Sequence, residues 1–120
     1  MLIKTESQCP QFVANDGCKI RELLHPKNDA IDLGFSLAIA EVAPGERSYR
    51  HRLVQSEVYY ILAGSGVVHV GPEERPIVTG DAVLIPPHHE QWIENTGLES
   101  LKFAATVAPP WRKDGDERLD

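Results

Sequence analysis

Residues 45–64 read GERSYRHRLVQSEVYYILAG, and residues 80–95 read GDAVLIPPHHEQWIEN. Both segments carry runs of β-branched and aromatic residues, which favour β-strands. Glu57–Leu62 is one such run and ends at the sequence AGSG, whereas Ala82–Ile85 ends at a pair of prolines. Because glycine and proline mark the turns between short strands, we predict that both segments fold as β-structure.

Strand patterns separated by turns continue outside these two segments. Further short runs of this kind are Phe35–Val42, Val67–Val70, Ile77–Thr79 and Leu101–Val107. About seven short strands with turns every 8–12 residues or so are typical of a sandwich or a barrel. No long amphipathic pattern indicates a helix, so the sequence predicts an all-β protein.

Composition and charge restrict the class of protein and its partners. The chain has 120 residues, of which 42% are hydrophobic and 25% charged, as in ordinary globular domains. A net charge of -6 with scattered basic residues argues against nucleic acid as a partner. No apolar run approaches the ~20 residues of a membrane span. With no secretory signal pattern, Cys9 and Cys18 are interpreted as free thiols of a cytoplasmic protein.

A chain of this length is expected to form one domain, residues 1–120. We predict a core barrel over residues 33–108, preceded by an N-terminal arm of residues 1–32 and followed by a polar tail of residues 111–120. The tail is rich in charged residues, which is typical of a solvated chain end. Alternatively, Trp111 anchors the tail across a barrel mouth.

The spacing of particular residues in the two quoted segments resembles the two sequence motifs of the cupin family. The matching positions are Gly45, His51, Glu57 and Gly64 in the first segment and Gly80, Asp81, Pro86 and Asn95 in the second. The resemblance implies a double-stranded β-helix, a jelly-roll-like β-barrel with a metal site inside. It also implies a homodimer, which is common among small cupins.

Two of the four positions where cupins usually bind metal have changed. The family pattern supplies three histidines and one carboxylate, but Leu53 and Gln91 occupy two of the histidine positions. The resemblance therefore assigns His51 and Glu57 as ligands, with Gln91 as a neutral amide ligand. Such a set suits a divalent transition metal, namely Mn, Fe, Ni, Cu or Zn. Open coordination positions would remain for water and substrate.

Residues that share strand parity with the three candidate ligands are expected to line the same pocket, because alternate residues of a strand point to one face. These residues are Tyr49, Leu53, Tyr59 and His89. Among them, His89 could replace a missing imidazole. The ligand positions also have structural alternatives: His51 could be a buried neutral imidazole that pairs with Glu57, and Gln91 could donate a hydrogen bond to Glu57. A buried carboxylate needs some such partner.

Three functions follow from these residues. In the first, a metal held by His51 and Glu57 polarises a small polar substrate, with Tyr59 or Tyr49 as proton donor. This enzyme could be an isomerase, a dehydratase or a dioxygenase. In the second, the barrel binds or senses a small ligand without metal, which the apolar Leu53 favours. In the third, His51 and Glu57 form a metal-free acid–base pair.

Overall fold

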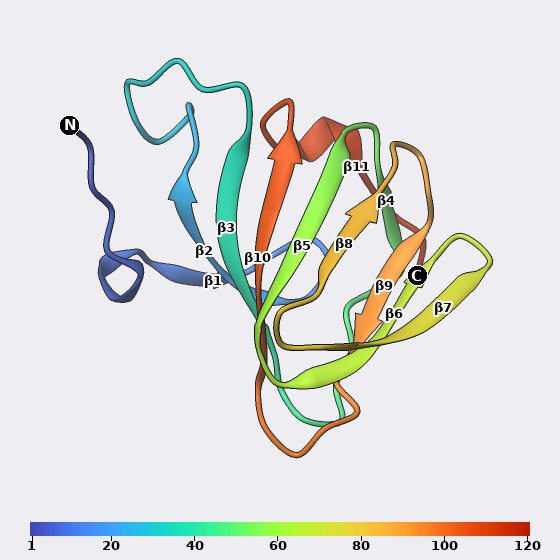
Figure 1. The fold of residues 1–120 in the computed structure, drawn as a ribbon. Helices are drawn as coiled ribbons and strands as arrows, with labels where there is room; N and C mark the ends of the chain where they lie inside the picture. The colour runs from blue at the N-terminus through green and yellow to red at the C-terminus, as the bar shows by residue number, and fades with distance from the viewer.

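The computed structural model describes all 120 residues and contains two antiparallel β-sheets that face each other (Figure 1). The larger sheet has the order β1 (Gln11–Val13), β2 (Lys19–Leu24), β3 (Ser36–Val42), β10 (Leu101–Ala108), β5 (Ser56–Ala63), β8 (Ala82–Ile85). The smaller sheet has the order β11 (Asp116–Arg118), β4 (His51–Leu53), β9 (Gln91–Glu94), β6 (Ser65–Val70), β7 (Glu73–Val78). The predicted all-β, jelly-roll-like double-stranded β-helix is confirmed.

Helical structure is limited to two 3-10 turns of three residues each, η1 (Glu6–Gln8) and η2 (Lys113–Gly115). No helix in the structure is long and apolar enough to cross a membrane.

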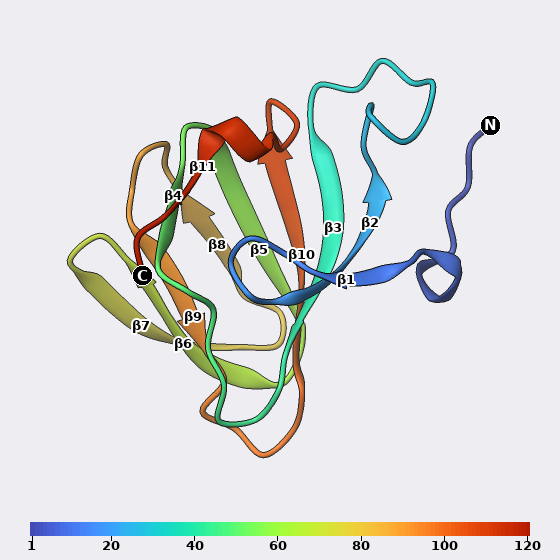
Figure 2. The same ribbon diagram turned by 180° about the vertical axis from the view of Figure 1, so that it is seen from behind.

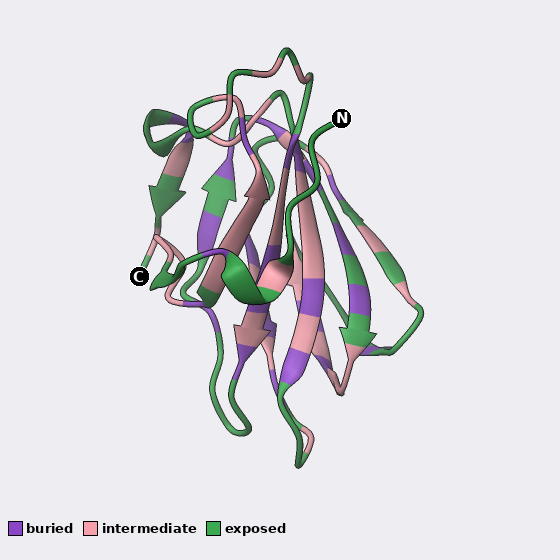
Figure 3. Ribbon diagram, turned by 90° about the vertical axis from the view of Figure 1, so that its left-hand side faces the viewer, coloured by how far each residue is buried: buried purple, intermediate pink, exposed green.

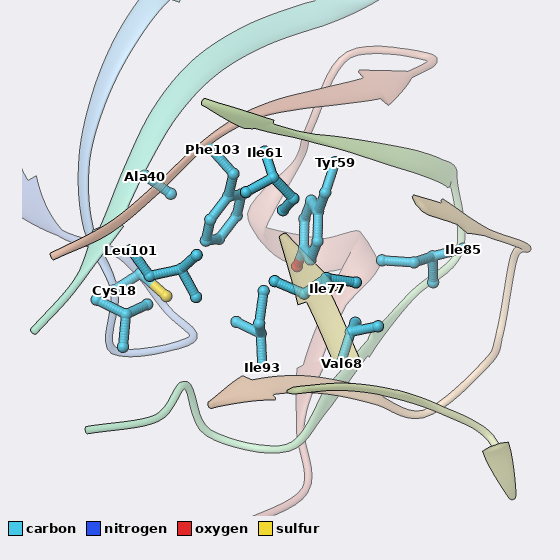
Figure 4. Close-up of a cluster of buried hydrophobic side chains, with 11 residues drawn as sticks. Cys18, Ala40, Tyr59, Ile61, Val68, Ile77, Ile85, Ile93, Leu101 and Phe103 are labelled. Carbon is cyan, nitrogen blue, oxygen red and sulfur yellow. The ribbon is translucent and has the colours of Figure 1, made fainter. Parts of the chain in front are cut away.

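The core lies between the two sheets, and the strands alternate between core and surface (Figure 3). In β5, Glu57, Tyr59 and Ile61 are buried, whereas the intervening residues are exposed. This period of two follows from the pleat of a strand. Figure 4 shows the central cluster, which consists of Cys18, Ala40, Val42, Tyr59, Ile61, Val68, Ile77, Ile85, Ile93, Leu101 and Phe103.

Asn95, directly after β9, and Gly66, the second residue of β6, both make close contacts with other segments of the barrel. The side-chain amide of Asn95 donates hydrogen bonds to the backbone carbonyls of Val42 (2.8 Å) and Glu99 (2.7 Å), which joins the two sheets below the core. Gly66 lies so close to the next strand that an added Cβ would be 2.1 Å from the carbonyl oxygen of Glu94. A side chain at position 66 would therefore separate β6 from β9.

Both ends of the chain join the sheets, beyond the predicted core of residues 33–108. The N-terminal arm supplies β1 and β2 to the larger sheet, and Figure 2 shows the loop between them reaching toward β4 and β11. The tail forms β11, which pairs with β4 so that Arg118 faces His51 and Asp116 faces Leu53. This pairing attaches the tail to the barrel, in line with the alternative in which Trp111 anchors it, while most tail residues remain exposed.

Candidate functional site

One cavity lies inside the barrel and has a volume of about 340 Å³. Its wall is mostly hydrophobic and includes Phe12, Ile20, Leu37, Phe103, Val107 and Trp111. The titratable side chains that line it include Asp16, His51, Glu57 and Asp116. Ligand sites commonly combine an apolar wall with a few polar groups in this way, so the cavity is the candidate site.

His51 is the first residue of β4, and its imidazole is buried, with the residue only 3% exposed. Its Nδ1 donates to Oδ1 of Asp116 at 3.2 Å. Its Nε2 has no hydrogen-bond partner and lies 3.7 Å from Oδ2 of Asp16. Burial lowers the pKa of His51, but the two aspartates outweigh burial and the net pKa is raised above its ordinary value.

Asp116 reaches His51 because β11 pairs with β4. Its second oxygen, Oδ2, accepts a hydrogen bond of 3.0 Å from the indole Nε1 of Trp111. Partial burial raises the pKa of Asp116, but the hydrogen bond and charge of His51 dominate, and the pKa is lowered overall. Asp116 therefore stays ionised and holds the proton of His51 on Nδ1.

Asp16 lies in the loop between β1 and β2, and Tyr49 fixes this loop. The backbone N–H of Tyr49 donates to the carbonyl of Asp16 at 2.6 Å. The Tyr49 ring covers Gly17, where an added Cβ would be 2.9 Å from the ring. On the tail, the guanidinium carbon of Arg118 lies 3.5 Å from the centre of the same ring. Tyr49 thus supports both segments that bring a carboxylate to His51.

Glu57 projects inward from β5 and is 6% exposed. No hydrogen bond reaches its Oε1. Burial raises the pKa of Glu57 to about 8, with a further increase from Asp16 and an opposing effect of His51. At neutral pH the protonated form of Glu57 is therefore favoured.

Gln91 faces His51 across the β4–β9 pairing and is 1% exposed. Its Oε1 accepts a hydrogen bond of 2.8 Å from the hydroxyl of Tyr59, whereas its Nε2 has no partner. Burial raises the pKa of Tyr59 well above its ordinary value, so the phenol keeps this proton. The Gln91 oxygen is consequently already used by a protein donor.

These side chains do not fit the four-ligand metal site that the resemblance implies. Leu53 has no donor atom, and the oxygen of Gln91 accepts a hydrogen bond from Tyr59. Nowhere in the structure do three or more His, Cys, Asp or Glu side chains form a group that could hold a metal ion. Of the four family ligand positions, His51 and Glu57 therefore keep a free ligand atom, Nε2 and Oε1 respectively.

Four of the predicted site residues line the cavity, and Gln91 lies next to it, hydrogen-bonded to Tyr59. His51, Glu57 and Gln91 are all buried, and Leu53 and Tyr59 line the cavity together with His51 and Glu57.

Tyr49 and His89 are not among the residues that line the cavity. Tyr49 precedes the start of β4, so strand parity does not apply to it, and it is 39% exposed. His89 lies in the turn between β8 and β9, where its Nδ1 contacts the carbonyl of Pro87 at 3.0 Å. It borders a separate open groove near Arg75.

Sequence reasoning missed Asp16 and Asp116. Their sequence separation from His51 is large (65 positions for Asp116), and neither belongs to a recognisable motif. The one available signal was Trp111, a large aromatic residue in a charged tail.

Comparison with known proteins agrees with this barrel. The family model described as the cupin domain matches residues 38–107. The chain belongs to the cupin family. The matched segment contains His51, Glu57 and Gln91, but neither Asp16 nor Asp116, so the partners of the cupin histidine come from outside the matched barrel.

A full-length relative of this cupin is the uncharacterized protein MJ1618 of Methanocaldococcus jannaschii. The two are 37% identical, and the alignment covers 99% of this chain and 96% of the relative. Among solved structures, a predicted oxalate decarboxylase from Thermotoga maritima has a TM-score of 0.78 and 26% identity, covering 90% of this chain and 99% of its own. The polyketide cyclase RemF from Streptomyces resistomycificus has a TM-score of 0.83 and 17% identity, covering 100% and 86%.

Proposed function

We propose that this cupin is a metal-free acid–base enzyme that transfers protons on a small molecule bound in the cavity. The observation that carries the proposal is the pairing of His51 with Asp116 beside the buried Glu57, with Nε2 of His51 and Oε1 of Glu57 both lacking partners. Two titratable groups with different surroundings in one pocket are typical of acid–base sites.

His51 serves as the general base. Because Asp116 accepts the proton on Nδ1, the neutral imidazole has its lone pair on Nε2, the nitrogen without a partner. When Nε2 takes a proton, Asp116 and Asp16 stabilise the imidazolium, as an aspartate does for a catalytic histidine in hydrolases. Asp116 is thus a positioning residue that acts through His51.

Glu57 serves as the general acid. A carboxylic acid with a pKa of about 8 carries its proton at neutral pH and can donate it. In an enolisation, Nε2 of His51 removes the proton from the carbon next to a carbonyl while Glu57 protonates the carbonyl oxygen. The product is a neutral enol, and the reverse transfers restore both groups. No oxidant or second substrate is required.

Exchange of carbon-bound protons for deuterium tests this function directly. The protein is incubated with EDTA in D₂O and the uncharged carbonyl compounds acetophenone and 2-tetralone, and exchange is followed by NMR. We expect exchange with at least one compound, lost in His51→Gln and in Glu57→Gln but retained in Glu117→Gln. Glu117 is a matched control because its exposed carboxylate pairs with Arg52 outside the cavity. Exchange that survives in Glu57→Gln would contradict the assignment of Glu57.

The two other functions predict different results in the same experiment. A metal-dependent isomerase, dehydratase or dioxygenase would be inactive in EDTA and restored by one divalent transition metal. A non-catalytic ligand-binding cupin is favoured by Leu53, whose apolar side chain occupies a family ligand position inside the cavity. It would show no exchange, although cavity ligands would raise the melting temperature.

The proposal includes a small-molecule partner, a homodimer and a cytoplasmic location. The exposed apolar side chains of β5, namely Val58, Tyr60 and Leu62, would supply part of the dimer contact. Sedimentation equilibrium of the purified protein tests the dimer, which Tyr60→Glu is expected to weaken.

A further inference from the structure

We infer that the cavity selects an uncharged ligand with a flat apolar body and discriminates against small carboxylate anions. This inference rests on the acid–base site proposed above and names its substrate class. It follows from the distribution of charge in the cavity and from the composition of its wall.

The cavity contains no cation that is free to receive an anion. Apart from the phenol of Tyr59, its titratable lining residues are Asp16, Glu22, His51, Glu57, Lys113 and Asp116. The one imidazole is already compensated by two carboxylates, at 3.2 Å and 3.7 Å. Lys113 is exposed, so water screens its charge, and no arginine lines the cavity.

An incoming carboxylate would therefore lose its hydration beside groups of its own charge. Asp16 is a carboxylate with one oxygen directed at Nε2 of His51, the same atom that a ligand must approach. Burying an unpaired charge is costly, and like charges add to this cost. A small dianion such as oxalate meets this penalty twice, so the substrate named for the Thermotoga maritima neighbour does not suit this cavity.

The rest of the wall favours a planar apolar body. Phe12, Phe103 and Trp111 contribute aromatic faces, and aliphatic side chains of β2, β3 and β10 complete the wall. Aromatic rings prefer such surroundings. A volume of about 340 Å³ is at the small end of ordinary ligand sites. One or two fused rings with an uncharged polar group that reaches Nε2 of His51 and Oε1 of Glu57 fit these limits.

Three pairs of nearly isosteric compounds separate charge from shape: benzamide and benzoate, 2-naphthamide and 2-naphthoate, and oxamide and oxalate. Binding is measured at neutral pH from backbone chemical-shift changes of cavity residues in ¹⁵N-labelled protein. For at least one ring pair, we expect the amide to bind at least about tenfold more tightly than the acid, since one unfavourable charge contact changes a dissociation constant by that order. Neither oxamide, which lacks a ring, nor oxalate should approach the affinity of the ring amides.

A variant identifies the residue responsible for the selection. Asp16→Asn keeps an oxygen that can accept the hydrogen bond from the backbone N–H of Cys18, but removes the charge. The preference for amide over acid should fall at least about threefold in this variant, whereas Glu117→Gln should retain it.

Equal or tighter binding of the acids would overturn the inference, and so would the absence of cavity shifts with both ring amides. These outcomes are distinguishable from failure of the proposed function because binding is measured without turnover. A protein that prefers amides but exchanges no protons would contradict the catalytic assignment alone. A protein that exchanges protons but prefers acids would contradict the ligand class alone.

Discussion

Oδ1 of Asp116 lies 3.2 Å from Nδ1 of His51, although the two residues are 65 positions apart. The contact depends on the pairing of β11 with β4, in which the last strand of the chain lies beside the strand that carries the histidine. The histidine of the cupin motif is therefore oriented by an acid from the tail.

Replacing Asp116 by Asn should lower the pKa of His51. The asparagine can still accept a hydrogen bond, but the negative charge that stabilises the imidazolium is lost. We expect this decrease to be measurable from the imidazole resonances in an NMR titration. Glu117→Gln on the same strand should leave the titration unchanged, and an unchanged pKa in Asp116→Asn would show that the contact is absent in solution.

Glu57→Gln should change how stability depends on pH. The folded-state pKa of Glu57 is about 8 and its ordinary value is 4.5, so the folded state binds the proton more tightly. The stability that the wild type gains from this proton is fully present below about pH 4.5 and is lost as the pH rises through about 8. The variant cannot ionise at this position. Its free energy of unfolding relative to that of the wild type should therefore be higher by roughly 2–4 kcal/mol at about pH 9 than at acidic pH, since each pH unit in the window contributes up to ~1.4 kcal/mol.

Urea unfolding at several pH values measures this difference. His51 acts in the same direction, because its pKa is also raised in the folded state. Asp116 acts in the opposite direction at low pH, because its pKa is lowered and its contribution is lost on acidification. Parallel stability curves for wild type and Glu57→Gln would mean that Glu57 is ionised in the folded protein at neutral pH.

The double variant Leu53→His/Gln91→His should gain metal binding. It restores imidazoles at the two positions that depart from the cupin pattern, beside His51 and Glu57. We expect about one equivalent of Co²⁺ or Ni²⁺ to remain after dialysis, compared with much less in the wild type, as measured by elemental analysis. A double variant that is folded but binds no metal would show that these four positions do not converge on one point.

Tyr49→Ala should disturb the site from outside the cavity. Removing the ring frees the loop at Gly17 and the Arg118 side chain, so both carboxylates near His51 become less well positioned. We expect the pKa of His51 to move toward its ordinary value and the exchange activity to fall. Tyr49→Phe keeps the ring and is the matched control. If His51 titrates in Tyr49→Ala as it does in the wild type, the Tyr49 ring has no influence on the site.

Gly66→Ala should destabilise the barrel. The new Cβ would be 2.1 Å from the carbonyl oxygen of Glu94, a backbone atom that cannot move without separating β6 from β9. We expect a loss of at least about 2 kcal/mol in the free energy of unfolding. Gly34→Ala, where nothing lies within 4 Å of an added Cβ, should change the stability little.

The barrel could be predicted because the residues of its motifs act locally. Strand runs in β5 and β8 end at glycine or proline turns, and Asn95 follows β9 where its amide can bind two carbonyls. Strand parity groups Leu53 and Tyr59 with the candidate ligands, and both lie within continuous strands that line the cavity. Strand parity does not apply to Tyr49, which lies before β4 begins.

The acidic partners of His51 could not be predicted, for a different reason. Asp16 and Asp116 are short polar residues in a loop and a tail, and nothing in their local sequence indicates a buried neighbour. Their role arises only from tertiary contacts, namely the β11–β4 pairing and the loop beneath Tyr49. A local pattern carries no information on such pairings.

The shared barrel and the groups that tune its histidine are thus encoded in different parts of the chain. Grafting the segments around Asp16 and Asp116 onto another cupin, or exchanging them for neutral ones here, would alter the proton affinity of the central imidazole while leaving the scaffold untouched. In this protein, the groups that adjust the proton affinity of the buried histidine therefore lie near the two ends of the chain.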